Sequence, residues 1–136
     1  MTNKLPRGIR NNNPGNIRHG DRWLGLTEKQ TDSAFCQFTE PKWGLRALAI
    51  LLRNYKRKHG IDTTRWIISR YAPANENDTI AYIRSVCKAI GCEPDDKLDL
   101  ESEVILLPLM RAIIHHENGQ QPYSDDEILD GIRAGK

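Results

Sequence analysis

One glutamate stands where a carboxylic acid could donate a proton. Residues 111–119 are Arg-Ala-Ile-Ile-His-His-Glu-Asn-Gly, so Glu117 follows an apolar segment and precedes Gly119 by two positions. In a helix that ends here, Glu117 would lie against an apolar face and near the negative end of the helix dipole. Both effects disfavour the ionised carboxylate, which suits a general acid that works near neutral pH. A glutamate at a helix end is more often simply solvated, so the assignment needs support from the rest of the chain.

Other acidic and metal-ligating residues are weaker candidates. Glu40 precedes Pro41 at an expected helix N-terminus, where the dipole stabilises a carboxylate. Glu28 and Asp32 could supply the second carboxylate that glycoside hydrolysis normally uses. The adjacent His115 and His116 would point about 100° apart on a helix, and no HExxH spacing is present. We therefore expect no metal and no cofactor.

Apolar residues at helical spacing predict a mainly helical chain after residue 40. The expected helices run from Pro41 to just before Gly60, from a cap at Asp62 or Thr63 to about Tyr71, from Asp78 or Thr79 to Gly91, from about Glu101 to Asn118, and onward from the capping-box spacing Ser124–Glu127. Pro108 should kink or divide the fourth of these helices. These helices must position Glu117.

The first 40 residues predict a small irregular or β lobe. Residues 8–18 hold too many turn formers for a helix, and two or three short strands are expected, the middle one near Ala34–Phe38. At 136 residues the chain has the length of one domain, with the lobe at 1–40 and the helical part at 41–136.

Two polar turns could line a cleft. The turn at residues 13–17 contains Asn16 and offers amide groups to a hydroxyl-rich ligand, and Trp23 offers a flat face to a sugar ring. The turn at residues 71–79 joins two helices and contains Tyr71 and Asn77. Taken alone, each also fits a purely structural role: a tight turn with a core tryptophan, and a capped helix corner.

The order of these motifs resembles that of peptidoglycan-cleaving enzymes of the lysozyme-like superfamily. The motifs are Asn12-Asn13-Pro14-Gly15-Asn16-Ile17, Trp23-Leu24-Gly25, Phe35 with Phe38, a long helix, and Tyr71-Ala72-Pro73. The chain looks closest to lytic transglycosylases and to flagellar and autolysin-type glucosaminidases. In those families the helix that carries the catalytic glutamate comes first, whereas here its counterpart ends at Glu117. The resemblance therefore implies a mainly α (α+β) lysozyme-like fold that is circularly permuted.

This resemblance also implies an activity and a site. The expected reaction is cleavage of the peptidoglycan backbone between N-acetylmuramic acid and N-acetylglucosamine, with Glu117 as general acid and then base. Asn16, Gln37, Tyr71 and Asn77 are the expected residues of the cleft wall. A lytic transglycosylase can work with a single acid, because the C6 hydroxyl of the sugar attacks the anomeric carbon. No second acid is obvious in the sequence, which favours that route, but hydrolysis remains open.

Composition and charge limit the classes of partner that this chain is expected to have. The net charge is +2, no apolar run is long enough to cross a bilayer, and the three cysteines form no CxxC pair. We expect a monomer that acts on peptidoglycan, with no nucleic-acid partner and no stable membrane insertion. The N-terminus lacks the apolar core of a signal peptide. The expected location is the host cytoplasm, followed by release to the periplasmic cell wall or carriage in a virion.

Two alternatives belong to other classes of protein. The chain resembles small phage and prophage proteins of virion or endolysin type over nearly its full length. A non-catalytic virion protein that binds peptidoglycan or other virion components is therefore the main alternative. The third is a nucleic-acid-binding domain that uses Arg53, Lys56, Arg57 and Lys58. A solvated helix face is the favoured explanation of this basic run, and the net charge of only +2 makes nucleic-acid binding the weakest of the three functions.

Overall fold

The computed structural model describes residues 5–72 and 76–136, and the side chains of all of these except residues 76 and 77. The described residues form six helices: α1 (Arg7–Arg10), α2 (Pro41–His59), α3 (Thr64–Tyr71), α4 (Glu76–Ile90), α5 (Glu103–Asn118) and α6 (Asp125–Ala134). The fold is thus mainly α, as predicted. None of these helices is long and apolar enough to cross a membrane.

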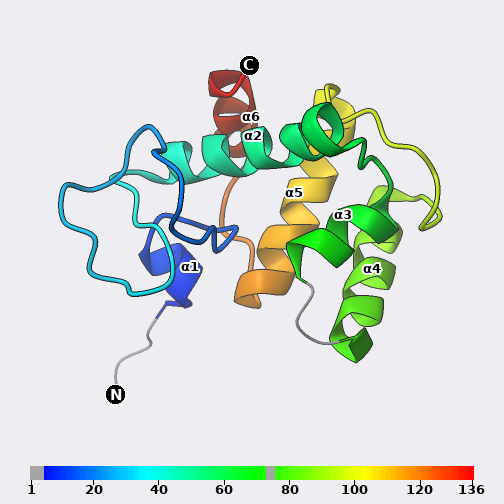
Figure 1. The fold of residues 1–136 in the computed structure, drawn as a ribbon, viewed down its shortest axis with the longest axis horizontal. Helices are drawn as coiled ribbons and strands as arrows, with labels where there is room; N and C mark the ends of the chain where they lie inside the picture. Colours follow the sequence, from blue (N-terminus) through cyan, green and yellow to red (C-terminus); the bar gives the residue numbers. More distant parts are fainter. Residues whose placement is uncertain (1–4, 73–75) are drawn as a thin grey trace.

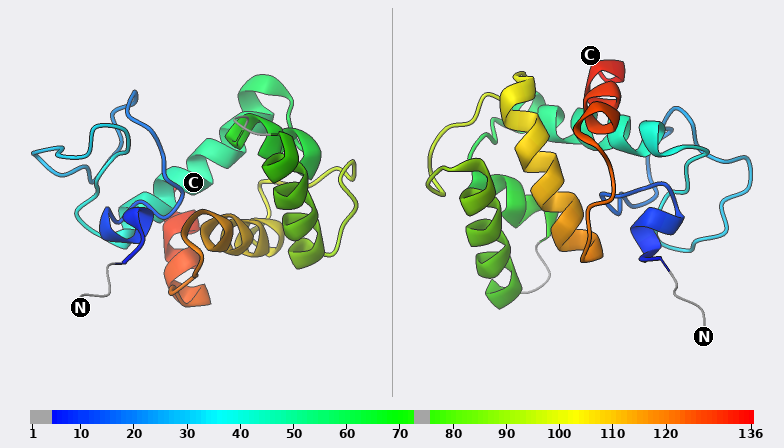
Figure 2. Two further views of the ribbon diagram at one scale, coloured as in Figure 1. Left: turned by 90° about the horizontal axis from the view of Figure 1, so that it is seen from below. Right: turned by 180° about the vertical axis from the view of Figure 1, so that it is seen from behind.

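The helices surround α5, which carries the candidate acid. Figure 1 shows α2 lying across one end of the molecule, with α5 crossing behind it, α3 and α4 on one side, and the lobe on the other. The view from below shows the lobe and the α3–α4 pair on opposite sides of α5 (Figure 2). Residues of the lobe and of the helices belong to one continuous hydrophobic core, among them Ile17, Phe38, Leu48, Ile68, Val86, Leu109 and Ile113.

Local sequence explains where most helices begin and end. Pro41 occupies the first turn of α2, and Gly60 ends α2 in the left-handed conformation with φ of 69°. The Thr63 side chain accepts a hydrogen bond from the Trp66 backbone N–H at the start of α3. Ser124 and Glu127 form the predicted capping box of α6. These predictions from the sequence are confirmed.

The start of one helix differs from the prediction, and one of the two outcomes expected at Pro108, division of the helix, is excluded. Helix α4 begins at Glu76, and the Thr79 hydroxyl donates to the Ala72 carbonyl at 2.8 Å instead of starting the helix as a cap. Helix α5 runs through Pro108 as one undivided helix. The backbone bond that Pro108 cannot form is the one to Val104, which is 79% exposed, so water can reach the freed carbonyl.

The predicted strands of the lobe are wrong. Among the described residues the lobe has only two isolated antiparallel bridges, Arg18 with Phe35 and Leu26 with Phe38. Side chains replace the ladder that paired strands would form: Asp32 accepts from the backbone N–H of Ala34 and of Phe35, and Asn13 donates to the carbonyls of Ile17 and Cys36. Such side-chain bonds compete directly with strand pairing.

The lobe also contains a helical turn that the sequence did not predict. Helix α1 covers Arg7–Arg10, inside the segment judged too rich in turn formers. Its single turn is held by tertiary contacts rather than by local propensity. Arg7 donates to both carboxylate oxygens of Asp32, and Gly8 packs closely against Asn16 and Asn118.

The basic run in α2 is not a uniform solvated face. Arg53 is 1% exposed and donates to the Ile132 carbonyl of α6 at 3.1 Å. Arg57 pairs with Glu101, and Lys56 pairs with Asp62. Three of the four cations assigned to possible nucleic-acid binding therefore have partners within the chain.

Candidate active site at the end of helix α5

Glu117 lies in the last turn of α5 with both carboxylate oxygens held by hydrogen bonds. The Asn16 side-chain amide donates to Oε1 at 3.1 Å, and the Tyr82 hydroxyl donates to Oε2 at 3.1 Å. Asn16 comes from the lobe, 101 positions away, whereas Tyr82 comes from α4. The carboxylate therefore joins three parts of the fold at one point. Glu117 itself is half-buried.

Asn16 faces Glu117 because its backbone is in an unusual conformation. Its φ is 51°, in the left-handed region that asparagine tolerates better than most residues. Asn118, the residue after Glu117 in α5, is buried. Its side-chain amide donates to the carbonyls of Pro14 and Ile114 at 2.8 and 3.0 Å. Asn118 thus ties the turn that carries Asn16 to the helix that carries Glu117.

The tight packing at this junction requires a glycine at position 8. The side-chain oxygens of Asn16 and Asn118, together with the Asn13 carbonyl, surround the position where a Cβ of residue 8 would lie. Neither of these two side-chain oxygens accepts a hydrogen bond from any of the described residues. Both asparagine side chains therefore keep their amide N–H groups directed away from α1, in the case of Asn16 toward Glu117.

One buried tyrosine, Tyr82, and one partly buried tyrosine, Tyr71, lie near Glu117. Burial and the nearby Glu117 carboxylate raise the pKa of Tyr82 far above its ordinary value. The same two causes raise the pKa of Tyr71, whose hydroxyl donates to the Gly15 carbonyl. Both phenols consequently stay protonated at neutral pH and act as fixed donors. The ring of His116 stacks on Tyr82 with 3.7 Å between centroids, so this histidine contacts the partner of Glu117.

A cavity of about 240 Å³ opens beside this cluster. Its wall contains Asn16 and Tyr71, and it is also lined by Ile17, Arg18, Asp21, Trp23, Leu51 and Tyr55. Three aromatic residues, Trp23, Tyr55 and Tyr71, therefore belong to the lining of one space. Glu117 does not line the cavity directly; Asn16 stands between the two, with its amide on Glu117. The cavity has the apolar faces and few polar groups of a typical small-ligand site.

The structure brings together three of the predicted site residues and separates a fourth. Glu117, Asn16 and Tyr71 meet, as the permuted arrangement requires. The Gln37 side chain instead holds the lobe together, accepting from the Thr31 N–H at 2.6 Å and donating to Asn11 at 3.2 Å. Asn77 lies in α4, but its side chain is outside the described part of the structure.

The asparagine run has mainly a structural role. Asn13 is fully buried and makes three hydrogen bonds to the lobe backbone, and Asn12 donates to the Phe38 carbonyl at 3.0 Å. Only Asn16 faces the carboxylate. Sequence patterns could not separate these asparagines, because the role of each depends on which segment of the lobe or which helix its side chain contacts.

Two residues of the cluster were missed or left in doubt by the sequence. Tyr82 fits an ordinary core position of α4, and its contact with Glu117 could not be inferred from helical spacing. Asp21 lines the cavity although the sequence pointed to Glu28 and Asp32 as second carboxylates. Asp32 is committed to Arg7, Asn11 and two backbone N–H groups, and the Arg7 guanidinium above all holds the pKa of Asp32 far below its ordinary value.

Histidines, cysteines and carboxylates do not gather into a metal site. No group of three such residues within the described part of the chain is placed to hold an ion. His115 and His116 are both exposed and face different surroundings, since His116 stacks on Tyr82 while His115 lies beside α4 and Gln121.

Comparison with known proteins places the chain beside a phage protein. No family model matches the chain. Over 137 aligned residues the chain is 40% identical to Protein P5 of Pseudoalteromonas phage PM2. The alignment covers 98% of this chain and 84% of the relative, so the similarity includes the lobe, all the helices and Glu117's segment. This chain belongs to the same family as that phage protein.

Proposed function

We propose that this protein cleaves the glycan backbone of bacterial peptidoglycan between N-acetylmuramic acid and N-acetylglucosamine, as a phage-type lytic transglycosylase or muramidase. One observation carries the proposal: the Glu117 carboxylate contacts Asn16, which forms the wall of a cavity with three aromatic rings. The name of the phage relative states no activity, so the proposal rests on this geometry and on the motif resemblance.

Glu117 has the connections that a proton-transferring group needs. When Glu117 is protonated, one of its two oxygens carries the proton. That oxygen donates a hydrogen bond, so it no longer accepts the one that Asn16 or Tyr82 donates to it in the resting state. Tyr82 is 2% exposed and fixed in the core, whereas Asn16 is half-buried and borders the cavity. We therefore assign Oε1, on the Asn16 side, to the proton that passes to the glycosidic oxygen. Positioned acid–base groups contribute about 10²- to 10⁴-fold in rate.

The cavity suits a sugar chain better than a compact polar metabolite. Flat rings bind the apolar faces of sugars, and Trp23, Tyr55 and Tyr71 all belong to the lining of this cavity. Trp23 lines the cavity with its ring and is only partly buried. Replacing Trp23 by leucine should therefore weaken glycan binding more than it lowers the turnover of bound glycan.

The choice between hydrolysis and transglycosylation turns on Asp21. Asp21 is the acidic residue in the cavity lining. Asp32, which the sequence suggested as a second carboxylate, is instead paired with Arg7. A single-acid transglycosylase would retain its activity in Asp21→Asn and would form 1,6-anhydromuramyl ends. A hydrolase that uses Asp21 to activate water or as a nucleophile would lose activity in Asp21→Asn and would form reducing ends.

The lysozyme-like, circularly permuted fold is part of the same proposal. Its support is the meeting of the last long helix with the asparagine-rich turn near the N-terminus, across 101 positions of sequence. An arrangement with Glu117 on the far side of the molecule from Asn16 and Tyr71 would have been incompatible with it.

The decisive experiment is digestion of purified Gram-negative peptidoglycan, with the products identified by mass spectrometry. Wild type and Glu40→Gln should release muropeptides, whereas Glu117→Gln should release none. Glu40 is the matched control, because it is an exposed glutamate at the start of α2, far along the chain from the cluster. Cleavage by Glu117→Gln at the wild-type rate would refute the assignment.

A non-catalytic phage virion protein that binds glycan is the second candidate. It is favoured by one observation: both Glu117 oxygens already hold hydrogen bonds, and Glu117 does not line the cavity. This function predicts sedimentation of the wild type with peptidoglycan without release of any fragment.

A further inference from the structure

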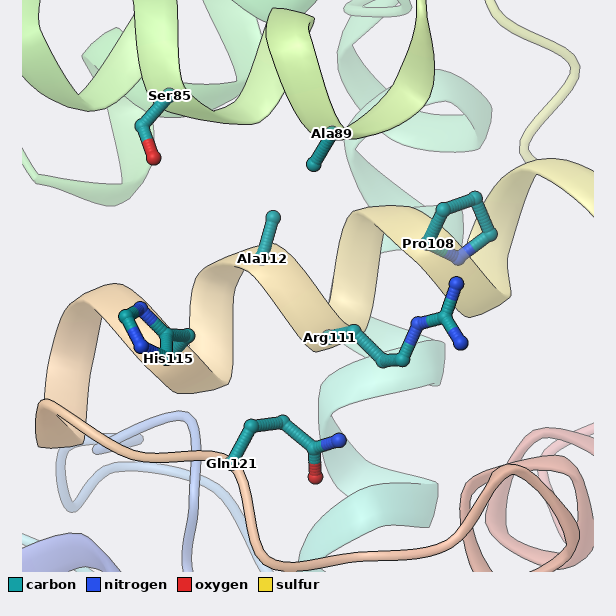
Figure 3. A pocket seen from close by; sticks show the side chains of 7 residues that line it. All are labelled: Ser85, Ala89, Pro108, Arg111, Ala112, His115 and Gln121. Carbon is teal, nitrogen blue, oxygen red and sulfur yellow. The ribbon is translucent and has the colours of Figure 1, made fainter.

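A second cavity lies on the opposite face of α5 from Glu117, and nothing in the proposed reaction uses it. Its volume is about 350 Å³, and it runs between α4 and α5 beside the connection to α6. Figure 3 shows Ser85 and Ala89 pointing from α4 toward α5, and Ala112 pointing back toward α4. We call this space the α4–α5 groove.

The lining of the groove combines three small residues, Ser85, Ala89 and Ala112, with larger polar ones. Along α5 its lining runs from Pro108 through Ala112 to His115, two turns of one helical stripe. Seven residues of helix span about 10 Å, which is the length of about three residues of extended chain. Ala89 and Ala112 have the smallest side chains of this lining, so a bound chain can approach α4 and α5 closely there. The shape therefore suits a short extended peptide.

The residues that line the groove include the cation Arg111 and no acidic residue, and the carboxylate of Asp125 lies next to the groove on Arg111. Arg111 and His115 line the groove itself. The Arg111 guanidinium reaches Asp125 at 2.8 Å, in a pair whose side chains are 42% and 55% exposed. An exposed pair of this kind is weak and can be exchanged for a ligand carboxylate.

We propose that the α4–α5 groove binds a short acidic peptide, with a peptide carboxylate on Arg111 and small side chains over Ala89 and Ala112. If the proposed function holds, the source of such a peptide is the alanine- and glutamate-containing stem of peptidoglycan. The groove would then hold the peptide part of the polymer while the opposite face of α5 acts on its glycan part. Only the source of the peptide depends on the proposed function; the chemistry of the groove does not.

Calorimetric titration with a free synthetic stem tetrapeptide tests the proposal without any cleavage step. Arg111→Gln and Asp125→Asn form a matched pair, because each breaks the same ion pair but only the first removes the cation. Arg111→Gln should weaken binding about tenfold or more, whereas Asp125→Asn should bind as tightly as wild type or more tightly. Equal weakening in both variants would overturn the proposal.

Two further tests change the size of a side chain in the groove and the charge of the peptide. Ala89→Phe should abolish binding by filling the groove, and Ile80→Phe, at an exposed position on the other side of α4 from Ser85 and Ala89, should not change it. A tetrapeptide amidated at its carboxyl groups should bind much more weakly than the free acid. Absence of binding by wild type, or equal binding of the amidated peptide, would refute the inference. Both results are independent of whether Glu117→Gln loses glycan cleavage, so failure of one proposal does not imply failure of the other.

Discussion

In the lobe, single side chains form the hydrogen bonds to backbone groups that paired strands would otherwise form. Asp32 shows this most clearly, since its carboxylate accepts from Arg7, Asn11 and the backbone N–H groups of Ala34 and Phe35. Its side chain is only 8% exposed. The lobe that carries Asn16 therefore depends on the ionised form of one acidic residue.

Acid should consequently destabilise the wild type more than Asp32→Asn. Arg7 first, and then the N–H groups of Phe35 and Ala34, hold the pKa of Asp32 well below the unfolded value of about 3.9. The resulting stabilisation is present above that unfolded value and is lost as pH falls toward the folded value. Thermal unfolding from neutral pH down to about pH 2 should show a steep fall in Tm for wild type and a shallower one for Asp32→Asn.

Asp95→Asn is the control for this acid-stability experiment. The Asp95 carboxylate also pairs with an arginine, Arg65, but its side chain is 69% exposed. Solvent screening makes such a pair worth little, so Asp95→Asn should follow the wild-type pH dependence. Identical curves for wild type, Asp32→Asn and Asp95→Asn would show that the Asp32 cluster does not hold the lobe.

At the scale of elements, the lobe is placed on α2 by a close backbone approach. Gly44 lies in α2 directly under the Asn12 carbonyl, and a Cβ at residue 44 would overlap that oxygen. The same lobe reaches α5 through Asn118, which bonds to the Pro14 carbonyl. The turn bearing Asn16 is thus held between two helices.

Gly44→Ala should therefore destabilise the protein although alanine favours helices. Helix propensity alone predicts a gain of about 1 kcal/mol for this change. Overlap with the Asn12 carbonyl should outweigh that gain, with a net loss of about 1–3 kcal/mol and displacement of Asn16 from Glu117. Urea unfolding followed by circular dichroism measures the free energy of unfolding. A more stable Gly44→Ala variant would show that the lobe does not rest on α2 as described.

At the scale of the whole molecule, every tyrosine of the chain is held in its protonated form. Burial raises the pKa of Tyr55 and of Tyr123 to about 12, and it also raises the pKa values of Tyr71 and Tyr82 well above their ordinary value. The four residues come from α2, α3, α4 and the connection before α6. Ionisation of tyrosine is therefore linked to unfolding of the whole fold.

Alkaline pH should accordingly lower global stability. A raised folded pKa gives a stabilisation that is complete below the unfolded value of about 10 and disappears as pH rises through the folded values. We expect Tm to fall from about pH 10 upward, with tyrosinate absorbance appearing together with loss of helical circular dichroism. Tyr82→Phe should reduce the slope of this fall. A tyrosine that titrates near pH 10 in the folded protein would contradict the prediction.

Much of the helical part could be predicted from the chain, because helix periodicity and end signals are local. Pro41, Gly60, Thr63 and the Ser124–Glu127 box act on backbone groups within one turn of themselves. Strands in the lobe could not be predicted correctly, since apolar spacing does not reveal that side chains such as Asp32 take the place of a paired strand.

For the candidate site, composition and pattern pointed to Glu117, Asn16 and Tyr71 but could not bring them together. Their meeting depends on contacts between residues 16 and 117, and between 82 and 117, which arise only when the helices pack around α5. Packing likewise assigned Gln37 to the lobe interior and Asp21 to the cavity wall. Local propensity acts over a few residues, whereas a site is assembled by burying apolar faces that lie far apart along the chain.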